Sequence, residues 1–360
     1  MNRRLLSFFA VTLLLALSTV IVILVAKGYR FDDQTRSLQG TGIISVSSIP
    51  AGASIYLDGE FVSATNNTIS NLTPKTYQLK VIKDGFSTWE KSVIVAAEKV
   101  SLVTITLFPT APDLRPLTFS GVKSPKISPD GQRLVYAVTA PAKAGLWMLD
   151  LSNQFFTFSR DPKQIASDTA AFSFSGSDFS WAPDSRTILV SGKTPAGKSV
   201  NYLLDSDTSN DSPVDVSQTI TKTTASWQSD LDLKNKDLLS HLSQKISADV
   251  TASPKALWSP DDLKVAFEKG GETKVYDLKT ETLSSIPQGD FSWFPDSAHL
   301  ILVNDSNISI VESDGGNKTT IYGGSFDKSA VFPWPDGSKL IILTTFNQSA
   351  GENLYSVGLR

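Results

Sequence analysis

The sequence predicts a mainly β protein: an N-terminal transmembrane helix, a small antiparallel β-sandwich, and a five- or six-bladed β-propeller with one helical insertion. Three observations carry this prediction. The chain opens with an uncharged apolar run, continues with short alternating segments broken by turn residues, and then repeats one turn motif at blade-sized intervals. The predicted domains are 1–27 (cytoplasmic tip and anchor), 28–42 (polar stalk), 43–109 (sandwich) and 110–360 (propeller).

The apolar run extends from Leu5 to Ala26 and carries no charged residue. As a helix, a run of about 20 residues crosses roughly 30 Å of hydrocarbon, so the lipid bilayer is the first predicted partner. The alternative is a cleaved signal peptide. Val25-Ala26-Lys27 offers no small-residue cleavage site, which favours a permanent signal anchor.

The composition excludes several classes of function. The 360 residues contain no cysteine, so disulfides, thiolate catalysis and Cys-ligated metals are ruled out. His241 and His299 are the two histidines and lie far apart, too few for a His-based metal site or triad. The net charge is −3 with no basic stripe, which disfavours nucleic acid as a partner. We expect no cofactor, no metal and no catalytic residue.

The first folded module begins at about Ile43. Alternating segments at 43–47, 54–57, 77–82, 93–95 and 100–107 are predicted strands, and Asp58-Gly59 is a tight-turn signal. With no convincing helical period, the segment predicts a small antiparallel sandwich.

Three short motifs in this module resemble the PEGA domain. Residues 48–59 (SIPAGASIYLDG) resemble its opening signature, with Ala51 at the glutamate position, and residues 72–77 and 83–89 resemble its second and third turns, with Lys75 in place of a glycine. The resemblance implies a small β-module of bacterial surface and envelope proteins that is not known as an enzyme. We expect turn and core roles for the motif residues Pro50, Gly52, Ala53, Asp58, Gly59, Gly85 and Phe86.

From Ala111 onward a Pro-Asp turn recurs at 128–131 (SPDG), 182–185 (APDS), 259–262 (SPDD), 294–297 (FPDS) and 334–337 (WPDG). Proline presets φ for the turn, and we expect each aspartate to accept hydrogen bonds from neighbouring backbone N–H groups. A degenerate copy of the motif at 226–230 (SWQSD) favours six blades over five. The predicted turn residues are Pro129, Asp130, Gly131, Pro183, Asp184, Pro260, Asp261, Pro295, Asp296, Pro335, Asp336 and Gly337.

An apolar strand follows each clear copy, and the pattern resembles the WD40-like propeller repeat of the TolB type. That resemblance implies the fold and says little about function. We expect residues 117–122 to pair with residues 354–359 and so close the ring.

Three further features each have two interpretations. Leu238, Leu239, Leu242 and Ile246 form a helical stripe within 231–246, which either packs on the propeller or docks a partner. The acidic run 205–211 has a calcium-like composition but lacks the glycine and glutamate of an EF-hand loop, which favours a solvated loop. The tryptophans beside the blade turns suit packing between blades better than sugar stacking.

These modules together predict a non-enzymatic, membrane-anchored scaffold or binding protein of the bacterial cell envelope. We expect the N-terminus in the cytoplasm and the propeller outside it, where it binds an envelope protein or glycan. Two alternatives stay open. The first is a propeller glycosidase or lyase with paired carboxylates in the central funnel. The second is an envelope sensor, whose propeller would lie in the cytoplasm.

Overall fold

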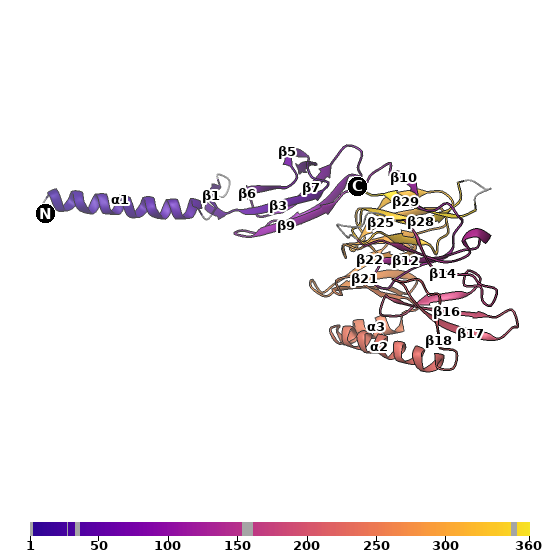
Figure 1. Ribbon diagram of the computed structural model, residues 1–360. Helices are drawn as coiled ribbons and strands as arrows, with labels where there is room; N and C mark the ends of the chain where they lie inside the picture. The colour runs from indigo at the N-terminus through magenta and orange to yellow at the C-terminus, as the bar shows by residue number, and fades with distance from the viewer. Residues whose placement is uncertain (1–2, 27, 33–36, 153–160, 347–350) are drawn as a thin grey trace. The chain divides into compact units, whose positions relative to one another are not determined.

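The computed structural model describes residues 3–26, 28–32, 37–152, 161–346 and 351–360 (Figure 1). The chain divides into two compact units, Met1–Thr110 and Ala111–Arg360.

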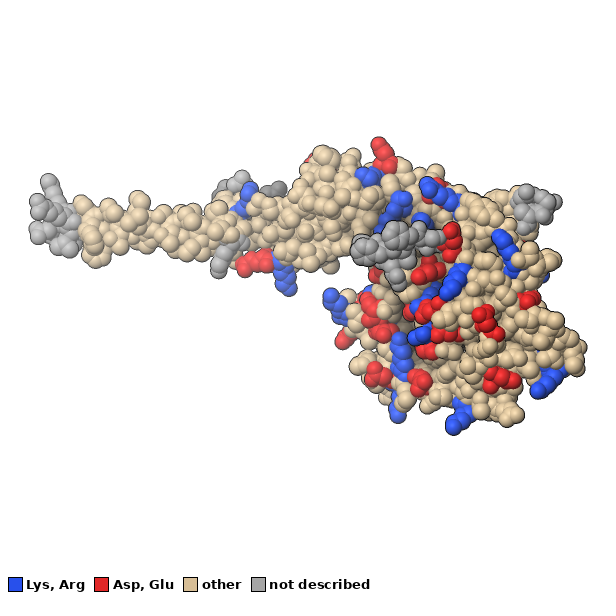
Figure 2. Space-filling view, in the orientation of Figure 1, with Lys and Arg blue, Asp and Glu red and all other residues tan. Residues whose placement is uncertain are grey.

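The first unit starts with helix α1 (Arg3–Ala26). Its segment Ser7–Ala26 has a mean hydropathy of 2.9 and no buried residues, so by length and composition it is able to cross a membrane. Hydroxyls in this run bond back to helix carbonyls, among them Thr12 Oγ1 to Phe8 O at 2.9 Å and Thr19 Oγ1 to Leu15 O at 2.8 Å. Figure 2 shows this helix without charged side chains between its ends. The same features fit a signal anchor or a signal peptide.

A short hairpin follows in the segment that we predicted to be a stalk. Strands β1 (Tyr29–Asp32) and β2 (Ser37–Gly40) pair antiparallel. Tyr29 Oη donates to Glu98 Oε1 at 2.6 Å, and Thr41 Oγ1 donates to Gly28 O at 2.6 Å. The Tyr29 bond connects the segment to the module that follows, and the Thr41 bond lies within the segment itself. The polar composition of the segment did not reveal this connection.

Two sheets form the sandwich. One has the order β6-β3-β9, with β3 (Gly42–Ile49), β6 (Asn67–Leu72) and β9 (Val100–Thr106). The other has the order β5-β4-β7-β8, with β4 (Ser54–Leu57), β5 (Glu60–Ala64), β7 (Thr76–Ile82) and β8 (Trp89–Ile94). Alternate residues of β3 are buried, as expected for a sheet with one covered face. One pair departs from the antiparallel prediction, because β3 and β9 run parallel.

Five four-stranded sheets make up the second unit. Blade 1 comprises β11 (Lys123–Ile127), β12 (Arg133–Val138), β13 (Gly145–Asp150) and β14 (Lys163–Ser167), with a 3-10 turn at Pro141–Lys143. Blade 2 comprises β15 (Asp178–Trp181), β16 (Thr187–Lys193), β17 (Ser199–Asp205) and β18 (Val214–Asp215). Blade 3 comprises β19 (Ala256–Trp258), β20 (Lys264–Lys269), β21 (Glu272–Asp277) and β22 (Thr282–Ile286). Blade 4 comprises β23 (Asp290–Trp293), β24 (His299–Val303), β25 (Asn307–Glu312) and β26 (Thr319–Gly323).

Blade 5 joins the two ends of the propeller. Its strands are β27 (Val331–Pro333), β28 (Lys339–Thr344), β29 (Asn353–Gly358) and, from the start of the unit, β10 (Leu114–Pro116). Figure 1 shows the magenta β10 beside the yellow β29. Leu117 N–H also donates to Leu354 O, and Val122 N–H to Glu352 O, both at 2.8 Å. The predicted closure is confirmed, with the ladder itself centred slightly earlier, at 114–116.

The preference for six blades was wrong, because the described residues of this unit contain five. The segment 226–230, which we interpreted as a degenerate copy of the motif, lies inside helix α2 (Ile220–Ser240). It lacks the proline of the other copies, so nothing in it stops a helix. Helix α3 (Gln244–Ala252) follows, and Ser243 Oγ caps its N-terminus by accepting from the Ile246 N–H. The predicted helical stretch 231–246 is therefore part of a longer pair of helices.

The helix pair covers one face of blade 3. Val265 and Phe267 of β20 pack against Ile246 and Val250 of α3, whereas Ala266, on the opposite face of the strand, packs towards blade 4. On this side blade 3 thus buries its apolar face against a helix instead of a blade. We gave two interpretations of the apolar stripe, packing on the propeller and docking of a partner. For Ile246 the structure shows the first, packing on the propeller.

Candidate functional site

The five Pro-Asp turns share one geometry. In each, the N–H of the fourth residue donates to the carbonyl O of the first, at 2.8–3.2 Å. The fourth residue has a positive φ of 56–72°, a conformation that glycine adopts freely and that Ser185, Asp262 and Ser297 adopt here. The Oδ1 of the turn aspartate accepts from the backbone N–H two residues later, at 2.8–3.1 Å, in Asp130, Asp184, Asp261, Asp296 and Asp336. The carboxylates of the turn aspartates therefore stabilise the turns by accepting hydrogen bonds from the backbone.

Two junctions between blades carry the same pair of hydrogen bonds. Between blades 1 and 2, the Trp181 Nε1–H donates to Lys126 O at 2.9 Å and the Asp130 N–H donates to Ser185 Oγ at 3.0 Å. Between blades 3 and 4, Trp293 Nε1–H donates to Leu257 O at 2.8 Å and Asp261 N–H to Ser297 Oγ at 3.1 Å. The indole N–H groups of these two tryptophans therefore bond one blade to the next.

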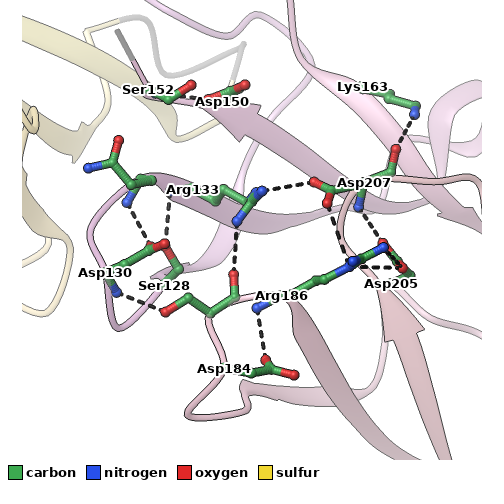
Figure 3. Close-up of polar contacts among 12 residues, drawn as sticks. Ser128, Asp130, Arg133, Asp150, Ser152, Lys163, Asp184, Arg186, Asp205 and Asp207 are labelled. Atoms are coloured by element: carbon green, nitrogen blue, oxygen red, sulfur yellow. Dashed lines mark hydrogen bonds and ion pairs between the residues drawn. The ribbon is translucent and has the colours of Figure 1, made fainter. Parts of the chain in front are cut away.

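Arginines neutralise the acidic run of residues 205–211 (Figure 3). Arg186 Nη2 lies 2.9 Å from Asp205 Oδ2, and Arg133 Nη2, from blade 1, lies 3.0 Å from Asp207 Oδ1. Asn210 Oδ1 accepts from the Asp205 N–H, so the loop also closes on itself. Among the described residues no group of three or more His, Asp or Glu is placed to hold a metal ion. The loop links two blades through ion pairs.

His299 is buried and pairs with the aspartate of the turn before its strand. It lies at the start of β24, is 6% exposed, and its Nδ1 lies 2.7 Å from Asp296 Oδ2. Burial favours the neutral form of Asp296, but the hydrogen bonds from His299 and from the backbone N–H groups of Ala298 and His299 outweigh it, so the pKa of Asp296 lies below its usual value. The other histidine, His241, is at the end of α2, in a different part of the unit.

The predicted PEGA-like residues lie at turns and in the core of the sandwich. Gly52, Gly59 and Gly85 have φ of 75°, 90° and 79°, and Pro50 follows a cis peptide bond. Ala53 is fully buried, and Phe86 packs at the edge of the same core. Asp58 fixes a turn, because its Oδ2 lies 2.7 Å from Lys75 Nζ and its Oδ1 accepts from the Gln78 N–H. The Lys75 hydrogen bond is the main cause that lowers the pKa of Asp58.

The candidate binding site is a cavity of about 620 Å³ at the strand ends opposite the Pro-Asp turns. It lies among blades 3, 4 and 5, and its charged lining residues are Glu268, Glu272, Asp290, Asp305 and Lys328. They come from hairpin tips and from the loops between blades. No sequence motif unites them, which is why sequence reasoning missed this site.

Lysines pair with three of the four carboxylates in this charged cavity. Lys328 Nζ lies 2.7 Å from Asp305 Oδ1, Lys274 pairs with Glu272, and Lys255 pairs with Asp290. The hydrogen bonds from Lys274 and Lys328 lower the pKa values of Glu272 and Asp305. Carboxylates held ionised in this way suit charge pairing with a polar partner. A general acid needs the opposite shift, a raised pKa.

One family model matches part of the chain. Residues 41–111 match the PEGA domain, which confirms that resemblance. No curated protein matches the chain.

The solved structures similar to this chain include two TolB proteins. A TolB-type protein from Agrobacterium tumefaciens is 15% identical over 68% of this chain and 89% of its own, with a TM-score of 0.24. TolB from Acinetobacter baumannii is 14% identical over 78% of this chain and 59% of its own, with a TM-score of 0.26. An auxiliary nutrient binding protein from Bacteroides thetaiotaomicron is 10% identical over 85% and 78%, with a TM-score of 0.21. With such TM-scores, the propeller is established by its own five sheets and not by these neighbours.

Proposed function

We propose that this chain is a membrane-anchored, extracytoplasmic binding protein of the bacterial cell envelope, and that its propeller binds an envelope protein or glycan. Helix α1 is the anchor in this proposal, with the N-terminus in the cytoplasm. The PEGA match in the adjoining module supports the extracytoplasmic side, because that domain resembles modules of surface and envelope proteins.

The single observation that supports the binding role best is the charged cavity. It is open, about 620 Å³ in volume, and carries charges of both signs on blades 3 and 4 and on the connection to blade 5. An arrangement of this kind gives specificity for a partner with complementary charges. The site lies at strand ends, whereas the broad faces of the blades pack against one another or, on one side of blade 3, against helix α3.

The same cavity supports a non-enzymatic role. A glycosidase needs one carboxyl protonated at neutral pH and another ionised. Lysine pairing and the lowered pKa values of Glu272 and Asp305 favour two ionised groups. We therefore place the glycosidase and lyase alternative second, and the binding role first.

Photo-crosslinking in living cells tests the proposal. A photo-reactive residue replaces Gln288, an exposed residue in the cavity lining, and in a matched variant it replaces Ser229 on the exposed side of α2. We expect a discrete adduct with an envelope component from position 288 and none from position 229. Equal labelling at the two positions, or no adduct from the cavity, would contradict a binding role for this face.

A further inference from the structure

A second, smaller pocket lies where the propeller ring closes. Its volume is about 230 Å³, and its walls include three aromatic residues, Phe119, Tyr136 and Trp147. Tyr136 of β12 and Trp147 of β13 are directly opposite in the strand register, so their side chains share one face of blade 1. Phe119 belongs to the connection between β10 and β11 and is 79% exposed. The aromatic wall is therefore continuous with the surface.

The walls of this aromatic pocket are held in place. Thr118 Oγ1 and the Gly121 N–H both donate to Asn353 Oδ1, at 3.2 Å each, which fixes the connection that bears Phe119. On the other side, the Trp147 Nε1–H donates to Lys143 O at 2.9 Å. A site whose walls are ordered before binding loses less entropy when a ligand enters.

One polar group in the pocket lacks a partner. Tyr136 is 2% exposed, lines the pocket, and its hydroxyl makes no hydrogen bond to any residue that the structure describes. Burial alone raises the pKa of this hydroxyl, so it is a neutral O–H donor. The hydroxyl is not among the fully buried side-chain atoms without a partner, which in the described part of the chain are Ser152 Oγ and Ser206 Oγ, so it is open to the pocket and a bound ligand can accept its hydrogen bond.

The remaining polar lining residues offer both kinds of charge. Lys143 Nζ donates to Ser120 Oγ at 3.1 Å, and Asp161 supplies a carboxylate to the wall. A sugar ring matches this set, because its apolar face packs on aromatic rings while its hydroxyls donate to a carboxylate and accept from Tyr136 and Lys143. A purely apolar side chain from a partner protein would leave the Tyr136 hydroxyl unsatisfied.

We propose that the aromatic pocket binds a single pyranose ring of an envelope glycan. Its volume is below the ~300–1,000 Å³ of pockets that enclose drug-sized ligands, which fits one ring and not an oligosaccharide. The inference deepens the proposed function and depends on it for the extracytoplasmic source of the glycan. For a monosaccharide we expect a Kd on the order of 1 mM.

The test uses the full-length chain in lipid nanodiscs, because sugar-based detergents would compete. Three probes, the methyl β-glycosides of glucose, galactose and N-acetylglucosamine, are titrated by ligand-observed NMR, together with N-acetylphenylalaninamide as a mimic of a peptide side chain. The variants are Tyr136→Phe, which removes only the unpartnered hydroxyl, and Phe119→Ala, at an exposed position. Tyr276→Phe, on blade 3, is the matched control.

We expect at least one glycoside to bind in the millimolar range. Tyr136→Phe and Phe119→Ala should each weaken it by about 5-fold, and Tyr276→Phe should leave it unchanged. Tyr136→Phe should keep or raise the melting temperature, which separates a binding effect from a folding defect. Binding unaffected by both pocket variants, binding of the phenylalanine amide alone, or no glycoside binding up to about 50 mM would overturn the inference.

The experiments distinguish failure of the sugar site from failure of the proposed envelope function. If no glycoside binds but position 288 crosslinks to an envelope partner, the sugar site is wrong and the binding protein stands. If the pocket binds a glycoside while the propeller proves to be cytoplasmic, the site stands and the envelope function is wrong.

Discussion

The backbone N–H of Asp130 donates a hydrogen bond to the Oγ of Ser185, 3.0 Å away in the next blade. Ser185 is 7% exposed and is the fourth residue of its own turn. The repeated turn therefore has two functions: its aspartate fixes the local bend, and its fourth residue receives the preceding blade. Where that residue is glycine, as at Gly131 and Gly337, this bond has no side-chain acceptor.

Ser185→Ala tests this junction. The substitution leaves the Asp130 N–H without its side-chain acceptor, and we expect the free energy of unfolding to fall by about 0.5–1.5 kcal/mol in chemical denaturation. Ser297→Ala, at the equivalent junction of blades 3 and 4, should have a similar effect. Ser229→Ala on the exposed side of α2 is the control. Wild-type stability in both junction variants would contradict a role for these bonds.

The turn aspartates should make stability fall in acid. At Asp184, burial favours the protonated form, but hydrogen bonds from Thr187 and from the Arg186 N–H outweigh it and lower the pKa. A lowered folded pKa gives stability that is complete above the unfolded pKa of about 3.9 and is lost as pH falls through the folded pKa. Asp184→Asn should thus lower stability at pH 6, with the difference shrinking below about pH 4.

The measurement for this prediction is chemical denaturation of the wild type and the variant across the pH range. Asp237→Asn, on the exposed side of α2, is the matched control. A difference between wild type and Asp184→Asn that stays constant down to the acid limit would show that the effect is not one of charge.

Helix α3 should be part of the propeller core. Ile246 is 7% exposed and packs on Val265 and Phe267, so Ile246→Ala should cost about 2–4 kcal/mol of unfolding free energy. Leu233→Ala in α2, where the side chain is 64% exposed, should change stability by less than about 0.5 kcal/mol. Both variants are measured by thermal and by chemical denaturation. If Ile246→Ala and Leu233→Ala lowered stability by the same amount, α3 would not cover blade 3 as described.

The acidic run 205–211 should not respond to calcium. Arg186 and Arg133 already pair with Asp205 and Asp207, so a cation gains little there. We expect about 5 mM CaCl₂ to shift the melting temperature by less than about 1 °C. A rise of several degrees that Asp207→Asn abolishes would identify a calcium site instead.

Much of the fold was predictable because its signals are local. Each Pro-Asp turn is encoded within four residues, and Asp58-Gly59 or Gly85 encode their bends in the same way. The number of blades was not predictable, because the sequence around Trp227 resembles a blade turn. It differs from the true turns in lacking their proline, and it lies in helix α2. The parallel pairing of β3 with β9 depends on contacts between distant segments.

The candidate sites were less predictable than the fold. Glu268, Asp290 and Asp305 meet only because blades 3 and 4 bring their strand ends together, and no spacing in the sequence records that. In the aromatic pocket, Phe119 comes from the connection between β10 and β11 and Tyr136 from strand β12, and the unpartnered hydroxyl is visible only in three dimensions. Sequence reasoning therefore located the scaffold and left its binding surfaces open.

Cysteine labelling tests the central claim most directly, because the chain has no cysteine of its own. Ser229→Cys in the propeller and Asn2→Cys before the helix are labelled in spheroplasts with a membrane-impermeant maleimide. The account predicts that residue 229 is labelled in intact spheroplasts and that residue 2 is labelled only after permeabilisation, in a chain of full length. Protection of residue 229, or loss of residue 2 from the mature chain, would contradict an anchored propeller outside the cytoplasm.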